Sequence, residues 1–422
     1  MNLNYARYVD RWIGLLICLV LFGLERATRP WTGRPIRALL ATTPPDDDAP
    51  LPPPRRVLCM KFYGLGNMIM LLPVLEALRR RHPQAEIDFM TMTANTALLE
   101  RAGSVSRTIG VDVSSAPAFL RSFRAAMRVV RARRYDTVVD FEQFVKISSI
   151  IAFLSGARER IGFNTDGQRR GFMYTRRVVY TDSDHMSAIF ARLLRPLDVV
   201  GTLPASTLEI GEADDRRAAA FLAEQGVGDD HFPIVAMHLG IGMNFYRVPL
   251  KRWAPENFAA VGDALAGRWD ARIVLTGRGD EERRLNAQAR AAMRHGAIDA
   301  CDRFDVMELA AFLARCHLVV ANDTSVMHLA ALVGTPVVAI FGPTAPLHYG
   351  PRGDRHLVFY RDLFCSPCLT NYNLKVSRCL DPVCMRGITP AMVVERIAEH
   401  YLDAGALHGA WLRARPRASG AA

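Results

Sequence analysis

The fold of this chain is decided by the stretch Ala321-Asn-Asp-Thr-Ser-Val-Met-His-Leu-Ala-Ala-Leu-Val-Gly-Thr-Pro-Val-Val-Ala-Ile-Phe-Gly-Pro-Thr344. It starts at the end of an apolar run and passes through polar residues that open a helix. The helix stops at residues 334–336, because glycine suits the position after a helix and proline cannot continue one. A second β-branched run follows at residues 336–341. The order strand, helix, strand predicts a parallel α/β unit.

Ligand-type residues follow both predicted strands of this unit. In open α/β sheets, ligands bind at the carboxyl ends of the strands. A helix opened by Asp323, Thr324 and Ser325 presents backbone N–H groups and a positive dipole end, which suits a phosphate. The same residues also fit an ordinary βαβ unit with a good helix cap. The pattern alone therefore leaves both interpretations open.

Predicted strands and helices alternate along most of the chain, which indicates parallel, doubly wound sheets. At 422 residues the chain is long enough for two or three domains. A polar stretch at residues 201–215 separates two series of similar build. We therefore predict an α/β protein with the GT-B arrangement, in which two Rossmann-like domains, 55–205 and 206–402, face a central cleft. The Arg/Ala/Gly-rich tail, 403–422, is predicted to be disordered.

Residues 1–54 differ from the rest of the chain. Residues 12–24 are almost wholly apolar, and the flanking residues include several arginines. The run is shorter than the ~20 residues that a membrane-spanning helix needs. It predicts an apolar interfacial helix whose arginines reach anionic head groups, followed by a Pro- and Asp-rich linker. The alternative is an N-terminal helix packed on the protein itself.

The net charge of the chain limits the kinds of molecule that it is expected to bind. Its formal net charge is +11, which suits nucleic acid, an anionic membrane surface or a phosphorylated substrate. No zinc-finger spacing and no RNP-type aromatic motif is present, so we expect no nucleic-acid partner. The two halves also lack the dinucleotide fingerprint and the P-loop. Lys251 and Arg252, near the start of a predicted helix, are the better candidates for a phosphate clamp.

Eight cysteines in a chain of this length do not indicate a disulfide scaffold. Four of them cluster late in the sequence, as Cys365-x-x-Cys368 followed by Cys379 and Cys384. The first pair has metal-like spacing and the second pair is looser. The cluster fits either a structural zinc knuckle or a loop stiffened by reduced cysteines.

Taken together, these motifs resemble the bacterial ADP-heptose:lipopolysaccharide heptosyltransferases, glycosyltransferase family 9. The resemblance lies in residues 322–331 and 336–344, and three further segments follow the family's order. These segments are the opening strand and turn with 72–79 after it, the run 251–258, and 275–277 with Glu281 beyond. The similarity extends from about residue 55 to residue 402.

The resemblance implies an inverting, metal-independent transfer of a sugar, heptose in this family, from an ADP-linked nucleotide sugar. The acceptor would be the lipopolysaccharide core or another lipid-linked glycan, at the cytoplasmic face of the inner membrane. No cofactor is implied. The residues that match the family's donor-site positions are Lys251 for the diphosphate, Glu281 near the ribose, and Asp323, Thr324, Ser325 and His328 around the donor sugar and diphosphate. Ser325 stands where the family usually has glycine.

One departure from the family concerns the general base. The family's first glycine turn reads Leu-Gly-Asp, whereas this chain has Leu65-Gly66-Asn67. A neutral amide cannot take a proton from the acceptor hydroxyl. Three interpretations remain: Asp140 or Glu142, at the end of another strand, serves as the base; Asn67 only orients the acceptor; or the protein is a GT-B scaffold that binds a nucleotide sugar or a partner without transfer.

Overall fold

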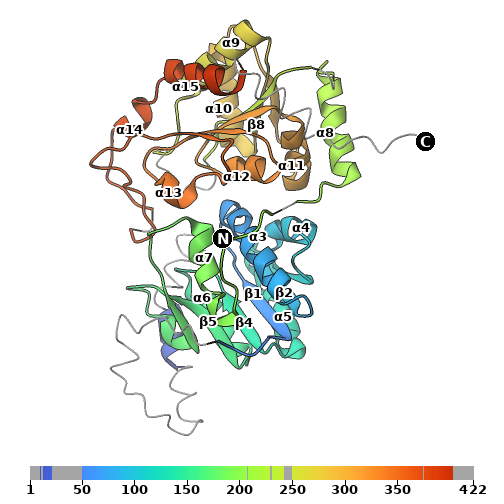
Figure 1. Cartoon of the computed structure of the whole chain (residues 1–422), viewed down its shortest axis with the longest axis vertical. Coiled ribbons are helices and arrows are strands. Elements are labelled where there is room, and N and C mark those ends of the chain that lie inside the picture. Colours follow the sequence, from blue (N-terminus) through green and yellow to red (C-terminus); the bar gives the residue numbers. More distant parts are fainter. Residues whose placement is uncertain are drawn as a thin grey trace, which may run out of the picture. The chain divides into compact units, whose positions relative to one another are not determined.

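The fold contains two separate six-stranded parallel sheets (Figure 1). The computed structural model describes residue 10 and residues 13–20, 50–206, 208–228, 231–241, 250–373 and 375–402. The chain divides into Met1–Ser206 and Thr207–Ala422, and each unit contains one sheet. Residues 21–49, which include the end of the predicted N-terminal helix and most of the linker, lie outside the described residues, as does the predicted tail.

The first sheet has the strand order β3-β2-β1-β4-β5-β6. Its strands are β1 (Arg56–Met60), β2 (Glu86–Met92), β3 (Arg107–Val111), β4 (Thr137–Asp140), β5 (Glu159–Asn164) and β6 (Arg176–Val179). The helices of this unit are α3 (Leu65–Arg81), α4 (Thr96–Arg101), α5 (Ala116–Arg133), α6 (Lys146–Leu154) and α7 (Met186–Arg192). The strand order reverses between β1 and β4, where doubly wound sheets bind ligands.

The second sheet repeats this arrangement, with the order β12-β11-β10-β7-β8-β9. Its strands are β7 (Ile234–His238), β8 (Arg272–Gly277), β9 (Ile298–Cys301), β10 (Leu318–Asn322), β11 (Val337–Ile340) and β12 (Leu357–Phe359). The helices are α8 (Glu212–Glu224), α9 (Pro255–Trp269), α10 (Gly279–Ala292), α11 (Val306–Arg315), α12 (Ser325–Leu332), α13 (Pro346–Tyr349), α14 (Val383–Arg386) and α15 (Pro390–Ile397). Here the order reverses between β7 and β10.

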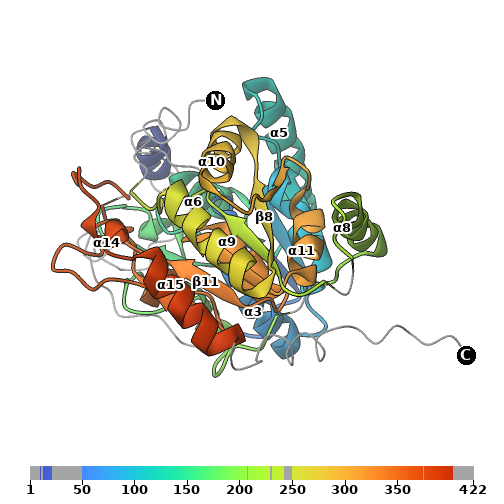
Figure 2. The same ribbon diagram turned by 90° about the horizontal axis from the view of Figure 1, so that it is seen from above.

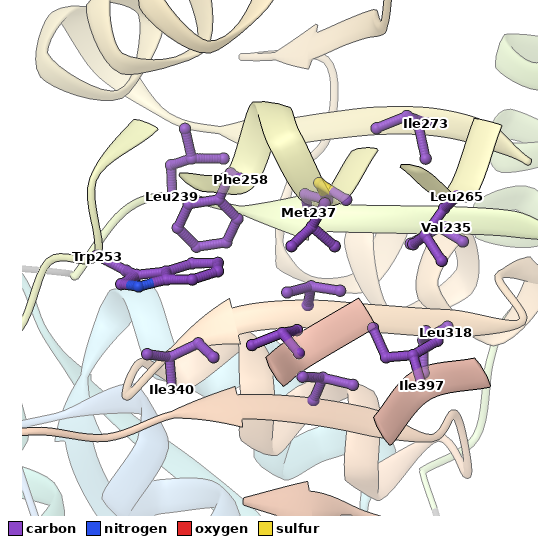
Figure 3. Close-up of a cluster of buried hydrophobic side chains, with 14 of the residues drawn as sticks. Val235, Met237, Leu239, Trp253, Phe258, Leu265, Ile273, Leu318, Ile340 and Ile397 are labelled. Atoms are coloured by element: carbon purple, nitrogen blue, oxygen red, sulfur yellow. The ribbon is translucent and has the colours of Figure 1, made fainter. Parts of the chain in front are cut away.

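The core of the second unit lies between one face of its sheet and helices α9, α10 and α15. Alternate strand residues point to this face, and Figure 3 shows Val235, Met237 and Ile273 packed beside Phe258 and other apolar side chains. Helix α9 contacts both α10 and α15 (Figure 2). This packing fixes the strand ends, from which the candidate site residues project.

The predicted α/β class and the alternation of strands and helices are confirmed. The sequence pattern did not indicate β6, β9 and β12, which are short strands at the edges of the two sheets. β6 and β9 contain charged residues and so lack the continuous apolar run of a central strand, whereas β12 is apolar but has only three residues. Helix α3 starts directly after Gly64, whose φ of 87° suits glycine.

The apolar N-terminal helix is not shown as a whole, because only residues 10 and 13–20 of this region are described and helical. Asp10 accepts hydrogen bonds from the backbone N–H groups of Lys146 (2.9 Å) and Ile147 (2.8 Å), and so caps α6. Cys18 is buried beside Ile150. None of the described helices is long and apolar enough to cross a membrane.

Candidate functional site

Asp323 is the centre of a polar cluster at the carboxyl ends of β10 and β11. Its Oδ2 atom lies 2.7 Å from the Lys251 Nζ atom and accepts a hydrogen bond of 2.6 Å from the Thr344 hydroxyl. Asp323 and Thr344 are buried, whereas the Lys251 side chain is 24% exposed. Burial raises the pKa of the Asp323 carboxyl, but the ion pair with Lys251 and the Thr344 hydroxyl outweigh it, so the pKa is lowered. Asp323 is therefore an anion that holds the Lys251 ammonium group in place.

Asn322 fixes the segment that carries Lys251. Its amide oxygen accepts the backbone N–H of Trp253 at 3.0 Å, and its amide nitrogen donates to the Leu239 carbonyl at 2.9 Å. Trp253 is buried against Phe258. The Asn322 amide therefore links the ends of β7 and β10 to the segment before α9. Asn322 lies in the motif that precedes α12, but its side-chain type alone indicates no role for it.

Helix α12 begins at Ser325, two residues after Asp323. Thr324 is its N-cap residue and has an extended backbone, but its side chain makes no capping hydrogen bond in the described structure. The first-turn N–H groups of a helix have no partner within the helix, and they carry its positive dipole end. Thr324 and His328 are buried and Ser325 is partly buried. Four of the predicted donor residues, Asp323, Thr324, Ser325 and His328, thus lie at the start of α12, where Asp323 contacts Lys251.

The structure does not place Glu281 in this cluster. Its carboxylate is 63% exposed and pairs with Arg252, with 2.5 Å between Oε1 and Nη2. The neighbouring Glu282 lies further in, with 16% exposure, and accepts the Arg278 backbone N–H at 2.8 Å. A Cβ atom at Gly240 would lie 1.8 Å from Glu282 Oε1, so any other residue at this position would displace the Glu282 carboxylate. Asp280, Glu281 and Glu282 follow one another in the sequence, so the sequence alone does not indicate which of these carboxylates is the more buried.

Asn67 lies in the first turn of α3, under the glycine turn of the first sheet. Its Nδ2 atom would lie 3.0 Å from a Cβ atom on Gly64, so the amide fills the space below that turn. Its Oδ1 atom is buried and has no hydrogen-bond partner among the described residues. Buried polar atoms are nearly always paired, so an oxygen left in this state is a candidate for contact with a ligand.

Asp140, the first candidate for the general base, is fully buried at the end of β4. Its Oδ2 atom lies 2.5 Å from Arg170 Nη2 and 2.6 Å from the Tyr174 hydroxyl, which donates to it. Its Oδ1 atom accepts the backbone N–H of Glu142 at 3.0 Å. Both oxygens are thus engaged, and these contacts favour a structural role over proton transfer.

Glu142, the second candidate, is also buried. Its Oε1 atom accepts the backbone N–H groups of Phe62 (2.7 Å) and Tyr63 (3.0 Å), and its Oε2 atom lies 3.3 Å from Lys61 Nζ. The carboxylate therefore holds the backbone that leads from β1 into the Gly64 turn. The two sheets share one feature at the point where the strand order reverses. A side chain that follows β4 or ends β10 makes hydrogen bonds to the backbone just after the neighbouring strand, β1 or β7. Glu142 does this in the first sheet and Asn322 in the second.

The four late cysteines are free thiols. Among the described residues, no group of three or more His, Cys, Asp or Glu side chains is arranged to hold a metal ion. Burial raises the pKa of the Cys384 thiol, and the neighbouring Cys368 and Cys379 raise it further. The zinc knuckle and the loop of reduced cysteines therefore both stay predictions.

The comparisons with known proteins agree with this geometry. The profile of glycosyltransferase family 9 (heptosyltransferase) matches residues 123–376. Lipopolysaccharide heptosyltransferase 3 of Escherichia coli is 23% identical over 309 residues, which cover 71% of this chain and 87% of that protein.

Two solved structures show a similar fold. The family 9 glycosyltransferase of Veillonella parvula has a TM-score of 0.71 at 23% identity, covering 85% of this chain and 100% of the other. The E. coli ADP-heptose lipopolysaccharide heptosyltransferase II has a TM-score of 0.64 at 20% identity, covering 85% and 99%. The two parallel sheets are thus similar to those of the GT-B heptosyltransferases. The family profile matches more than half of the chain, which shows that this chain belongs to glycosyltransferase family 9 and is an enzyme of the glycosyltransferase type.

Proposed function

We propose that this protein transfers heptose from ADP-heptose to a lipopolysaccharide-core acceptor. The observation that carries the proposal is the cluster of Lys251, Asp323 and Thr344 beside the start of α12. A cation and a helix N-terminus are suited to a diphosphate. The names of the relatives, which are lipopolysaccharide heptosyltransferases and an ADP-heptose enzyme, support the choice of sugar, nucleotide and acceptor.

In this proposal the reaction is a single inverting displacement. The acceptor hydroxyl oxygen forms a bond to the anomeric carbon while the bond from that carbon to the phosphate oxygen breaks. ADP leaves with the electron pair, and the hydroxyl proton passes to solvent water. Lys251 and the N–H groups of α12 stabilise the negative charge that develops on ADP, and they do so without rearranging because Asp323 and Asn322 already hold the segment. The proposal assigns no step to a metal ion.

A nucleotide-release assay tests the function. The purified protein is given ADP-heptose with and without a lipopolysaccharide acceptor that lacks the terminal heptose, and ADP is measured. Release that requires the acceptor supports transfer. The second candidate, a scaffold that binds the nucleotide sugar without transfer, is favoured by the amide at Asn67. It predicts that ADP-heptose raises the melting temperature while no ADP is released. Neither release nor stabilisation would contradict both functions.

We also propose that Asn67 receives the acceptor hydroxyl, which would donate its hydrogen bond to the unpartnered Oδ1 atom. If so, a carboxylate at this position would be well placed to take the proton. Asn67→Asp should therefore raise kcat by about 100-fold, the low end of what a positioned base contributes. Asn67→Ala should lower kcat, while the affinity for ADP stays unchanged in both variants. Equal turnover in all three proteins would show that Asn67 does not meet the acceptor.

A membrane surface is the proposed setting of this reaction, at the cytoplasmic face of the inner membrane. In the helical segment 13–20, Leu16 is 63% and Val20 is 54% exposed, while Cys18 on the other side packs on the protein. Residues four apart share one face of a helix, so Leu16 and Val20 form an apolar surface. Arginines flank the segment in the sequence and suit anionic head groups.

The membrane proposal predicts a loss of vesicle binding. Leu16→Ser/Val20→Ser should lower the partition onto phosphatidylglycerol–phosphatidylethanolamine vesicles by about tenfold, because apolar area that would be buried in lipid is removed. The matched control, Val200→Ser/Leu380→Ser, removes the same two side-chain types at other exposed positions. Cosedimentation measures both. Equal partition of the two double variants would contradict a role for this segment.

A further inference from the structure

The cysteine-containing loop after β12 is fastened to the end of β11, beside the Asp323 cluster. The Ser366 hydroxyl donates to the Gly342 carbonyl at 2.5 Å, and the Leu369 N–H donates to the Pro343 carbonyl at 2.7 Å. A Cβ atom at Gly342 would lie 2.2 Å from the Met385 sulfur, so the chain packs closely on this turn. The loop therefore has a defined position relative to the polar cluster.

Lys375 is held at a fixed place within this loop. Its backbone N–H donates to the Thr370 carbonyl at 2.9 Å and to the Asn373 side-chain oxygen at 3.1 Å. Asn373 also donates to the Cys368 carbonyl at 2.8 Å. Lys375 has a φ of 62°, a left-handed conformation that a lysine rarely adopts without such contacts. This local geometry directs the Lys375 side chain toward α13.

The Lys375 ammonium group lies against Tyr349, the last residue of α13. Its Nζ atom donates to the Tyr349 hydroxyl at 2.9 Å and lies 4.1 Å from the centre of the ring. The Tyr349 hydroxyl in turn donates to Asn371 at 2.8 Å. The positive charge of Lys375 also contributes to the lowered pKa of Asp323, after the contributions of Lys251 and Thr344. The ammonium group is thus close enough for its field to reach the Asp323 cluster.

The charges in this cluster show why a second cation matters. Lys251 and Asp323 form an ion pair with no net charge, so the pair alone offers a diphosphate little long-range attraction. With Lys375 the three charges sum to +1. We propose that Lys375 is a second cationic residue of the donor site and binds the diphosphate of the nucleotide sugar. This inference rests on the proposed function. In it, the cysteine-containing loop positions the Lys375 ammonium group.

Titration calorimetry with ADP and with AMP tests the role of Lys375. In Lys375→Met the Kd for ADP should rise by about tenfold, because a charge-assisted contact to the diphosphate is lost. The Kd for AMP should change much less, because AMP lacks the β-phosphate. Lys375→Arg keeps the charge and should retain most of the affinity for ADP. The matched control is Arg378→Met, which removes an exposed cation from the same loop and should leave both affinities unchanged.

The outcomes separate this inference from the function on which it rests. If the unmodified protein binds ADP and Lys375→Met binds it as tightly as Arg378→Met does, the role of Lys375 is overturned and the proposed function stands. If the unmodified protein binds no ADP, both are overturned. A melting curve of Lys375→Met checks that the variant is folded. Loss of ADP affinity in Lys375→Arg as well would show that the loop needs this particular side chain for its shape, and would count against a charge-based role.

Discussion

Replacing Arg170 by methionine is expected to lower the free energy of unfolding by about 3–5 kcal/mol, the usual cost of leaving a buried charge without its partner. Arg170 and Asp140 are both fully buried. The guanidinium also donates to the Glu142 carbonyl at 2.7 Å, so one side chain ties the end of β4 to the segment that follows it. Methionine fills much of the same volume but leaves the Asp140 carboxylate facing an apolar group.

Urea unfolding measures this effect. The matched control is the neighbouring Arg169, which is exposed, and Arg169→Met should change the unfolding free energy by less than about 0.5 kcal/mol. Arg170→Met/Asp140→Leu removes both charges and should be less destabilising than Arg170→Met alone. If Arg170→Met matched Arg169→Met, the ion pair would not support the fold. Asp140 would then regain its standing as a candidate for the general base.

The architecture was predictable because it depends on periodicity. Central strands such as β7 and β10 are buried on both faces and appear in the sequence as continuous apolar runs. The edge strands lack that signal, because β6 and β9 contain charged residues and β12 has only three residues. The order of the strands could not be predicted from the sequence either, because it depends on pairings between segments that are far apart in the chain.

The site was predictable only where chemistry and position along the chain coincide. Lys251 and Asp323 were both named as candidates and lie 2.7 Å apart. The sequence does not show how deeply a single carboxylate is buried or which group pairs with it. Asp140 lies at the end of a strand, as a catalytic residue would, yet it forms an ion pair with an arginine thirty positions later. Lys375 carried no signal at all, because its relevance depends on how the cysteine loop folds back on β11.

Replacing Lys251 by methionine should lower kcat/KM for ADP-heptose by about 100-fold, the low end of what one preorganised group that stabilises developing charge contributes. The ammonium group is positioned before the donor binds, by Asp323 at 2.7 Å and by the neighbouring Trp253, whose N–H is held by Asn322. Its interaction strengthens as negative charge moves onto the leaving ADP. The loss should therefore appear in kcat as well as in KM.

Two variants separate this effect from damage to the fold. Arg252→Met removes the adjacent cation, whose partner Glu281 is largely exposed, and should lower kcat/KM by less than about threefold. Lys251→Met leaves the buried Asp323 carboxylate without its ion pair, so burial would then raise the pKa of that group and cost stability. Lys251→Met/Asp323→Asn relieves that cost without restoring a cation. If the double variant regained stability but stayed about 100-fold slower, the defect would lie in leaving-group stabilisation. If it regained activity, Lys251 would serve only to neutralise Asp323, and the donor phosphate would have to be bound by other groups.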